Sequence, residues 1–184
     1  MKHVMAWMAS AAVLNFTKPV SGGQNDPRLP MLFDELNAAI DPDEAASIEM
    51  SIWELWTTSG DSDVDQLMAI GLVALSNEQF REAIAVFDKI VEIMPGFAEG
   101  WNKRATAYYL IGDYQRSTAD VEKVLALEPR HFGALSGLGL IALDIGEPEQ
   151  ALEAFETALM IHPHMSGADP QIRMLRDKLR GRDI

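Results

Sequence analysis

The sequence predicts an all-α protein in which three 34-residue helix–turn–helix units stack into a solenoid. The first observation is a period, because Pro95, Pro129 and Pro163 lie 34 residues apart. The second is that large and small apolar residues recur in fixed columns at that period, three or four residues apart within each half-unit, as on one face of a helix. These columns hold Leu67, Trp101 and Leu135; Gly71, Ala105 and Gly139; Ala74, Tyr108 and Ala142; Ala83, Ser117 and Ala151; and Phe87, Val121 and Phe155.

The chain ahead of the repeats, residues 24–63, predicts a divergent pair of helices that caps the solenoid. Residues 24–29 are polar, and we expect them to be loose. A helix over 27–40 and a second over 41–60, which begins at Asp41 or Asp43 with Pro42 in its first turn, each carry one apolar stripe. We expect Trp53 and Trp56 in the core, since tryptophan is usually highly buried; an exposed aromatic site is the alternative. The two stripes are Leu29, Leu32, Phe33, Leu36 and Ile40, and Ala45, Ile48, Ile52, Trp53 and Trp56.

The three repeats span residues 64–97, 98–131 and 132–165. Turn signals divide each repeat into two helices at 76–79, 112–114 and 146–148, and the closing proline ends the second helix. The small columns let the two helices of a pair approach closely. They also account for Gly139 and Ala142 in "GLGLIA" (137–142), because a dinucleotide-binding loop needs a preceding strand and this segment follows a helix and a turn. Arg104 and Ser117 depart from their columns, which predicts a local polar interaction in the second repeat.

The two ends of the chain carry different signals. Residues 166–184 predict a final capping helix with Ile172, Leu175 and Leu179 on its inner face and a frayed tail at 181–184. Residues 1–23 have the layout of a secretory signal peptide, with Lys2 and His3 before an apolar stretch over 4–16 that is too short to span a bilayer. We therefore expect export to the periplasm, with a cytoplasmic protein or one anchored by this segment as the alternatives.

Composition narrows the class of partner. The net charge of -13 argues against nucleic acid, which is bound through a surplus of Lys and Arg. The absence of cysteine excludes thiolate nucleophiles and cysteine metal sites. Residues 24–100 hold 3 basic and 16 acidic residues, whereas residues 101–184 hold 10 and 12. The acidic half is interpreted either as a solvated surface or as a docking face for a basic partner.

The 34-residue unit, with its large and small columns in the first helix, its Ala and Phe columns in the second and its closing proline, resembles the tetratricopeptide repeat (TPR) over residues 64–165. This resemblance implies antiparallel helix pairs in a right-handed superhelix, with the first helices lining a concave groove. In TPR domains that hold the C-terminal carboxylate of a chaperone, Lys, Asn and Arg side chains form a clamp. The positions that match this clamp are Met68, Leu72, Lys103, Gly133 and Gly137, so the resemblance implies that the clamp is absent here.

The sequence shows no constellation for catalysis and predicts no cofactor and no metal site. Ser136 is not in a G-x-S-x-G elbow, because Ala134 and Leu138 flank it. His131, His162 and His164 lie in the turns between repeats, where we expect them to be exposed. A metal-dependent hydrolase or enzyme subunit using these histidines is the rival hypothesis, although metal sites generally need three or four ligands in a defined geometry.

The leading functional prediction is a non-enzymatic protein-interaction module, an adaptor or assembly factor that binds a helical or extended segment of an envelope protein. A self-associating structural protein, or a groove filled by the chain's own terminal helix, are alternatives. The predicted groove consists of first-helix residues outside the packing columns: Met68, Leu72, Asn102, Lys103, Thr106, Tyr109, Ser136, Leu140 and Leu143.

Overall fold

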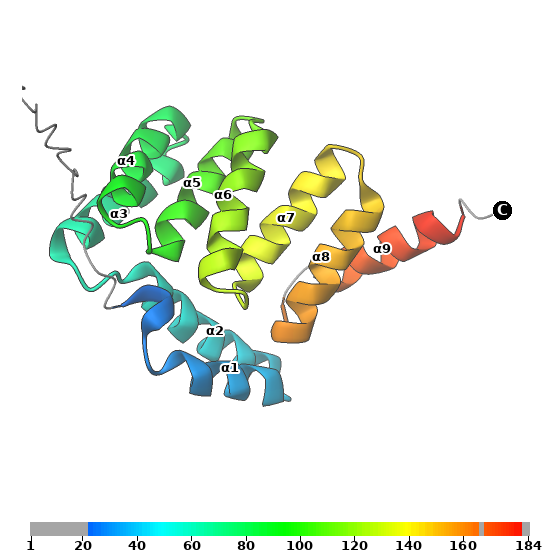
Figure 1. The fold of residues 1–184 in the computed structure, drawn as a ribbon. Helices are drawn as coiled ribbons and strands as arrows, with labels where there is room; N and C mark the ends of the chain where they lie inside the picture. The colour runs from blue at the N-terminus through cyan, green and yellow to red at the C-terminus, as the bar shows by residue number, and fades with distance from the viewer. Residues whose placement is uncertain (1–21, 166–167, 182–184) are drawn as a thin grey trace, which may run out of the picture.

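The computed structural model describes residues 22–165 and 168–181, and all regular structure in these ranges is helical (Figure 1). None of the helices in these ranges is both long and apolar enough to cross a membrane. The predicted signal peptide falls almost entirely outside the described residues. The elements are a 3-10 helix η1 (Gly23–Asn25) and the α-helices α1 (Leu29–Ala38), α2 (Pro42–Thr57), α3 (Ser62–Ser76), α4 (Phe80–Ile93), α5 (Ala98–Leu110), α6 (Tyr114–Leu127), α7 (Phe132–Asp144), α8 (Pro148–Ile161) and α9 (Ala168–Arg180).

The predicted repeats are the pairs α3–α4, α5–α6 and α7–α8, stacked side by side in chain order (Figure 1). Their small columns have the predicted role. A Cβ at Gly71 would lie 2.4 Å from the ring of Phe87, and one at Gly139 would lie 2.7 Å from the ring of Phe155. These two glycines therefore let the helices of a pair approach closely enough for the phenylalanine of the second helix to pack on the backbone of the first.

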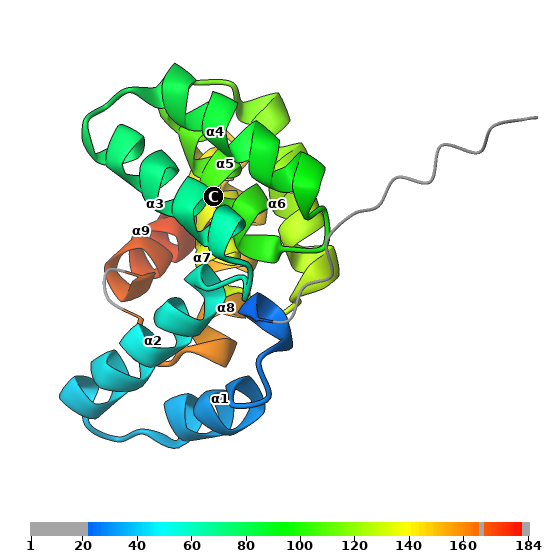
Figure 2. The same cartoon turned by 90° about the vertical axis from the view of Figure 1, so that its left-hand side faces the viewer.

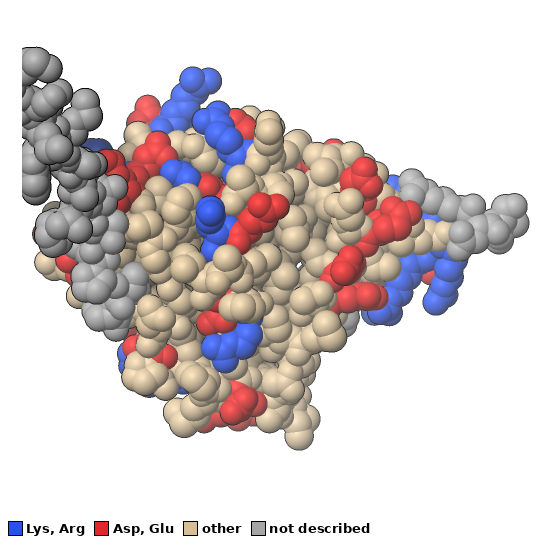
Figure 3. Space-filling view, in the orientation of Figure 1, with Lys and Arg blue, Asp and Glu red and all other residues tan. Residues whose placement is uncertain are grey.

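The C-terminal helix α9 caps the last repeat, as the sequence predicts. Ile172 and Leu175 are buried against the α7–α8 pair, in a cluster with Ala142, Ala151 and Phe155. Most of the remaining surface of α9 is polar, with Met174 exposed among the charged side chains. In Figure 3, Lys and Arg atoms gather over this end of the molecule. A helix with one apolar and one charged side is what a solenoid needs at its end.

The N-terminal helix pair forms as predicted, but its place differs from a cap stacked ahead of the first repeat. Figures 1 and 2 show α1 and α2 running beneath the repeats, on the side away from α4. Trp56 and Phe33 pack there with Phe132 and Leu135 of α7 and Ala158 of α8. Aromatic area buried against the last repeat, more than 70 residues away in sequence, therefore decides where the pair docks.

Two details of the N-terminal region correct the sequence prediction. Residues 24–29 are not loose, because the Gln24 side chain donates to the Gly96 carbonyl at 2.5 Å and accepts from the Ala98 N–H at 3.2 Å. The backbone N–H groups of Gly22 and Gly23 also donate to the Ser59 and Thr58 carbonyls. Ile40 lies beyond the end of α1 and is exposed, whereas Leu29, Phe33 and Leu36 of the same predicted stripe are buried.

The polar interaction predicted in the second repeat is confirmed. Arg104 of α5 makes two hydrogen bonds of 2.7 Å to the buried Asp120 carboxylate of α6 and one of 2.7 Å to Asp88 of α4. The buried Ser117 hydroxyl donates to the Ala105 carbonyl at 2.8 Å. One guanidinium thus joins α4, α5 and α6, which ties the first repeat to the second through charge-assisted bonds.

Candidate functional site

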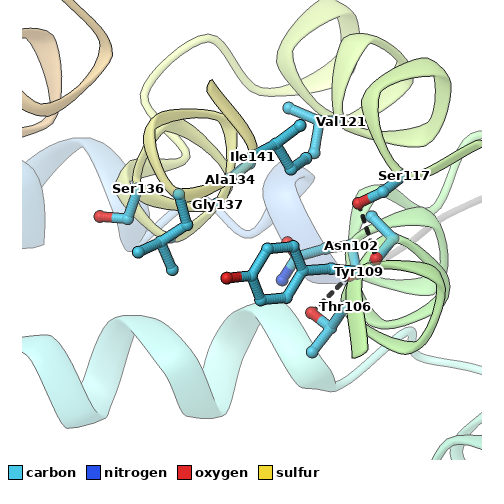
Figure 4. Close-up of a pocket in the computed structure, with 12 residues that line it drawn as sticks. Asn102, Thr106, Tyr109, Ser117, Val121, Ala134, Ser136, Gly137 and Ile141 are labelled. Carbon is cyan, nitrogen blue, oxygen red and sulfur yellow. Dashed lines mark hydrogen bonds between the residues drawn. The ribbon is translucent and has the colours of Figure 1, made fainter. Parts of the chain in front are cut away.

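A pocket of about 190 Å³ lies between α5 and α7, with one wall formed by α6. Its α5 side comes from positions i, i+4 and i+7 of one helix face, namely Asn102, Thr106 and Tyr109, and its α7 side from Ser136 and Leu140 (Figure 4). Residues four or seven apart share a helix face, so the repeat geometry alone brings these side chains to a common opening. The other lining residues are Ala105, Ser117, Val121, Gly133, Ala134, Gly137 and Ile141.

The polar groups of the pocket are largely engaged with the protein itself. The Thr106 hydroxyl donates to the Asn102 carbonyl at 3.0 Å, and the Ser136 hydroxyl contacts the Met165 sulfur at 3.3 Å. Burial raises the pKa of Tyr109 and the nearby Asp144 carboxylate raises it further, so the phenol is protonated at neutral pH. With its few polar groups used as donors to the protein, the pocket is suited to holding an apolar side chain beside weakly polar contacts, and not to acid–base chemistry.

Beside the pocket lies a buried charge cluster centred on Glu99, a residue that is 1% exposed. One carboxylate oxygen lies 2.8 Å from Lys103 Nζ, and the other lies 3.0 Å from both Asn102 Nδ2 and His131 Nε2. His131 Nδ1 accepts the Ala134 N–H at the start of α7, which leaves Nε2 to donate to Glu99. Burial acts to raise the pKa of Glu99, but Lys103 and His131 outweigh it and lower that pKa to about 2. The carboxylate is therefore ionised, with one oxygen in an ion pair with Lys103 and the other hydrogen-bonded to Asn102 and His131.

Helix α2 closes this end of the groove. The Trp56 ring stacks on His131 with centroids 4.0 Å apart, and the Trp53 ring lies 5.0 Å from Lys103 Nζ. A Cβ at Gly133 would lie 2.5 Å from the Trp53 ring, so the absence of a side chain at Gly133 makes room for the indole of α2. Two of the positions that match the chaperone clamp, Lys103 and Gly133, are consequently covered by the chain itself.

The structure brings together five of the nine predicted groove residues: Asn102, Thr106, Tyr109, Ser136 and Leu140. The other four lie elsewhere. Met68 is 2% exposed in the core of the first repeat, where Leu72 also packs, because the first repeat is offset along the array from this pocket. Lys103 is held by Glu99, and Leu143 packs in the cluster under α9.

Sequence reasoning missed the residues that shape the pocket walls. Val121 comes from a second helix, and the groove prediction considered first helices only. Gly137 lies outside the small columns, and a Cβ there would meet nothing within 4 Å. That departure from the repeat pattern was the available signal, because a glycine that packing does not require points to open space beside it.

The histidines correct a second prediction, since they are not exposed turn residues. His131 and His162 are almost fully buried, and His162 Nε2 lies 3.1 Å from Glu49 of α2. His164 Nε2 lies 2.8 Å from the Ala39 carbonyl. Each ring faces a different partner, and the described residues contain no group of three or more His, Asp or Glu placed to hold a metal. These histidines fasten the N-terminal helix pair to the ends of the repeats.

The stacked helix pairs are shared with known proteins. A family model described as tetratricopeptide repeat matches residues 68–117 and 102–171, which together make up more than half of the chain. The chain belongs to the tetratricopeptide repeat family. A TPR repeat-containing protein of Rhizobium etli is 37% identical over 175 residues, which is 94% of this chain and 86% of that protein.

Solved TPR structures share the fold. The Sgt2 TPR domain from Aspergillus fumigatus matches with a TM-score of 0.62 and 23% identity, over 67% of this chain and 83% of that one. The first TPR of Spaghetti (RPAP3) bound to HSP90 peptide SRMEEVD matches with a TM-score of 0.62 and 22% identity, over 65% and 96%. At these identities the likeness concerns the solenoid fold alone.

Proposed function

We propose that this TPR protein is a non-enzymatic interaction module that holds an extended or helical segment of a partner protein in the groove between α5 and α7. The observation that carries the proposal is the pocket beside Tyr109 and Gly137, an opening of about 190 Å³ that the protein's own packing leaves unfilled. The Spaghetti (RPAP3) domain of the same fold is bound to a peptide, which supports a segment as the ligand.

The chemistry of the groove distinguishes this module from a carboxylate clamp. Lys103 is neutralised by Glu99, and Gly133 and Gly137 offer no charged group. We infer that the bound segment is recognised through an apolar side chain in the pocket, and not through a terminal carboxylate. Tyr109 suits this role, because a tyrosine combines a large apolar body with a polar tip.

The proposal includes a compartment and a class of partner. We propose that the chain is exported to the periplasm and that its partner is a protein of the cell envelope, on the basis of the signal-like pattern in residues 1–23. N-terminal sequencing of the native protein tests this directly. Recovery of soluble protein that still begins at Met1 would overturn export.

A photo-crosslinking amino acid placed at Thr106 tests the groove. We expect adducts with one partner segment in native cells, identified by mass spectrometry, and a synthetic peptide of that segment should bind the purified protein. Gly137→Leu should weaken peptide binding at least ten-fold by filling the pocket, since its side chain would enter open space. Leu110→Ala, at the next position after Tyr109 on an exposed face of α5, is the matched control and should leave affinity unchanged. Equal binding by both variants would place the site elsewhere.

A further inference from the structure

The first repeat presents an uncovered face whose counterparts in the other repeats are packing surfaces. We call Gln66, Ile70 and Val73 of α3 the first-repeat face. Ile70 is 50% exposed and Val73 is 60% exposed. At the period of 34 residues, Val73 corresponds to Ala107 and Ile141, which are 0% and 2% exposed. Ala107 and Ile141 are each buried by the preceding repeat. No described residue covers Val73 in the same way.

The rest of the molecule shows what kind of element fits such a face. Gly100, the counterpart of Gln66, lies so close to α4 that a Cβ there would be 2.7 Å from Ile90 Cγ2 and 3.6 Å from Val91 Cγ1. In the next repeat, Ala134 and Ile141 pack in one cluster with Val121 and Val124 of α6. In both cases the cover is the apolar side of an α-helix, formed by Ile90 and Val91 in α4 and by Val121 and Val124 in α6.

The N-terminal helix pair does not supply this cover. Its apolar stripe is used against α7 and α8, through the cluster that contains Trp56 and Phe132. In Figure 2, α1 and α2 lie below α3 and α4. A solenoid needs a polar outer surface on its terminal repeat, and α9 provides one at the other end. Two exposed β-branched residues on the first repeat are therefore an open stacking surface.

The charge of the first repeat indicates which kind of helix could dock on this face. Between Asp61 and Ile93 the chain carries seven acidic residues against Arg81 and Lys89, and the whole chain has a net charge of -13. In a dimer formed through this face, the acidic first repeat of one copy would lie against that of the other, which like-charge repulsion disfavours. A helix with Lys and Arg beside its apolar stripe meets both the shape and the charge.

We propose that the first-repeat face docks a basic amphipathic α-helix of another protein, which stacks on α3 as α4 stacks on α5. This surface is separate from the groove at Tyr109 and does not depend on the function proposed for it. The bound helix would extend the solenoid by one element, with its apolar residues spaced i, i+3, i+4 and i+7 against Ile70 and Val73.

The test uses the full chain and a synthetic helical peptide of about 20 residues, long enough to form a helix. Its leucines are spaced i, i+3, i+4 and i+7, and lysines occupy the flanking positions. We expect it to bind at least ten-fold more tightly than a peptide of the same composition with alternating leucines, and at least ten-fold more tightly than a glutamate-for-lysine version. Higher salt should weaken binding.

Substitutions test whether the peptide binds at the first-repeat face. Ile70→Gln with Val73→Gln should reduce affinity at least ten-fold with helicity unchanged by circular dichroism. Met50→Gln, at an apolar position of α2 that is even more exposed, and Gly137→Leu in the groove should have no effect. Equal binding by the double variant and the wild type would overturn the proposal, as would failure of the patterned peptide to bind. So would a wild-type dimer that the double variant dissociates, or crosslinks from position 70 to the chain's own residues 1–21, because these identify a different occupant.

Discussion

Glu99, a residue of the second repeat, helps to fix the N-terminal helix α2 in place through His131. Its carboxylate is buried, yet Lys103, Asn102 and His131 give it three partners, and His131 in turn carries the Trp56 ring of α2. Removing one member of such a buried charge cluster destabilises the fold strongly, because it leaves the other members unpaired.

Glu99→Gln is therefore expected to lower the free energy of unfolding by about 3 kcal/mol at pH 7. The pKa of Glu99 is lowered in the folded state from 4.5 to about 2, so its contribution is present above pH 4.5 and is lost as the pH falls towards 2. Urea denaturation of both proteins at pH 7, 4 and 3 measures this. The difference should shrink with falling pH, and the exposed Glu92→Gln should show almost none. A difference that does not change with pH would contradict the assigned charge state.

Two glycines of α7 offer a matched pair of substitutions. Gly133→Ala would place a Cβ 2.5 Å from the Trp53 ring and should cost about 1–3 kcal/mol of stability, as overpacking does. Gly137→Ala meets nothing within 4 Å and should stabilise the helix by about 0.5–1 kcal/mol. Thermal denaturation should move the two melting temperatures in opposite directions. Equal increases would mean that Trp53 does not press on α7 in solution.

At the scale of elements, the second repeat replaces an apolar pair by an ion pair. Arg104 and Asp120 stand where the other repeats have Ile70 with Val86 and Leu138 with Ala154. The stack tolerates the exchange because Arg104 satisfies the buried carboxylate with two hydrogen bonds. The repeat pattern therefore specifies the position of the pair, and leaves its chemistry open.

Arg104→Leu should lower the free energy of unfolding by about 3–5 kcal/mol, since it leaves the Asp120 carboxylate buried and unpaired. Adding Asp120→Val, which gives the second repeat an apolar pair like those of the other repeats, should recover most of that loss. Chemical denaturation of the two variants measures the difference. A double variant as unstable as the single one would show that the link from Arg104 to Asp88, and not the buried pair, holds the second repeat.

The helices of the repeats could be predicted from the sequence because their partners are one helix or one period away. The place of α1 and α2 could not, because it depends on Phe132 and Ala158, which no local pattern connects to Trp56. The burial of His131 and His162 was missed for the same reason, since α2 supplies their cover. In the groove, five first-helix positions of the second and third repeats were predictable. Lys103 pairs instead with Glu99 and Leu143 packs under α9, and only the assembled fold reveals these contacts.

At the scale of the whole molecule, the N-terminal pair changes the way the repeats are coupled. A plain solenoid has only neighbour contacts, so its stability is close to a sum over adjacent repeats. Here α1 contacts α8 and α2 contacts α5, while Asn37 donates to the Met160 carbonyl and His162 pairs with Glu49. These contacts link the start of the described chain to its last repeat, across the base of the array.

Trp56→Ala tests that coupling, because Trp56 is the largest fully buried side chain where the pair meets the repeats. Truncating it should cost about 3–5 kcal/mol. In hydrogen exchange, the amides of α1, α2 and the start of α7 should then exchange much faster, while those of α3 and α4 keep their protection. Trp101→Ala, which alters a repeat column instead, should affect α4 and α5 and spare α1 and α2. If Trp56→Ala accelerated exchange evenly across all helices, the N-terminal pair and the repeats would unfold as one unit.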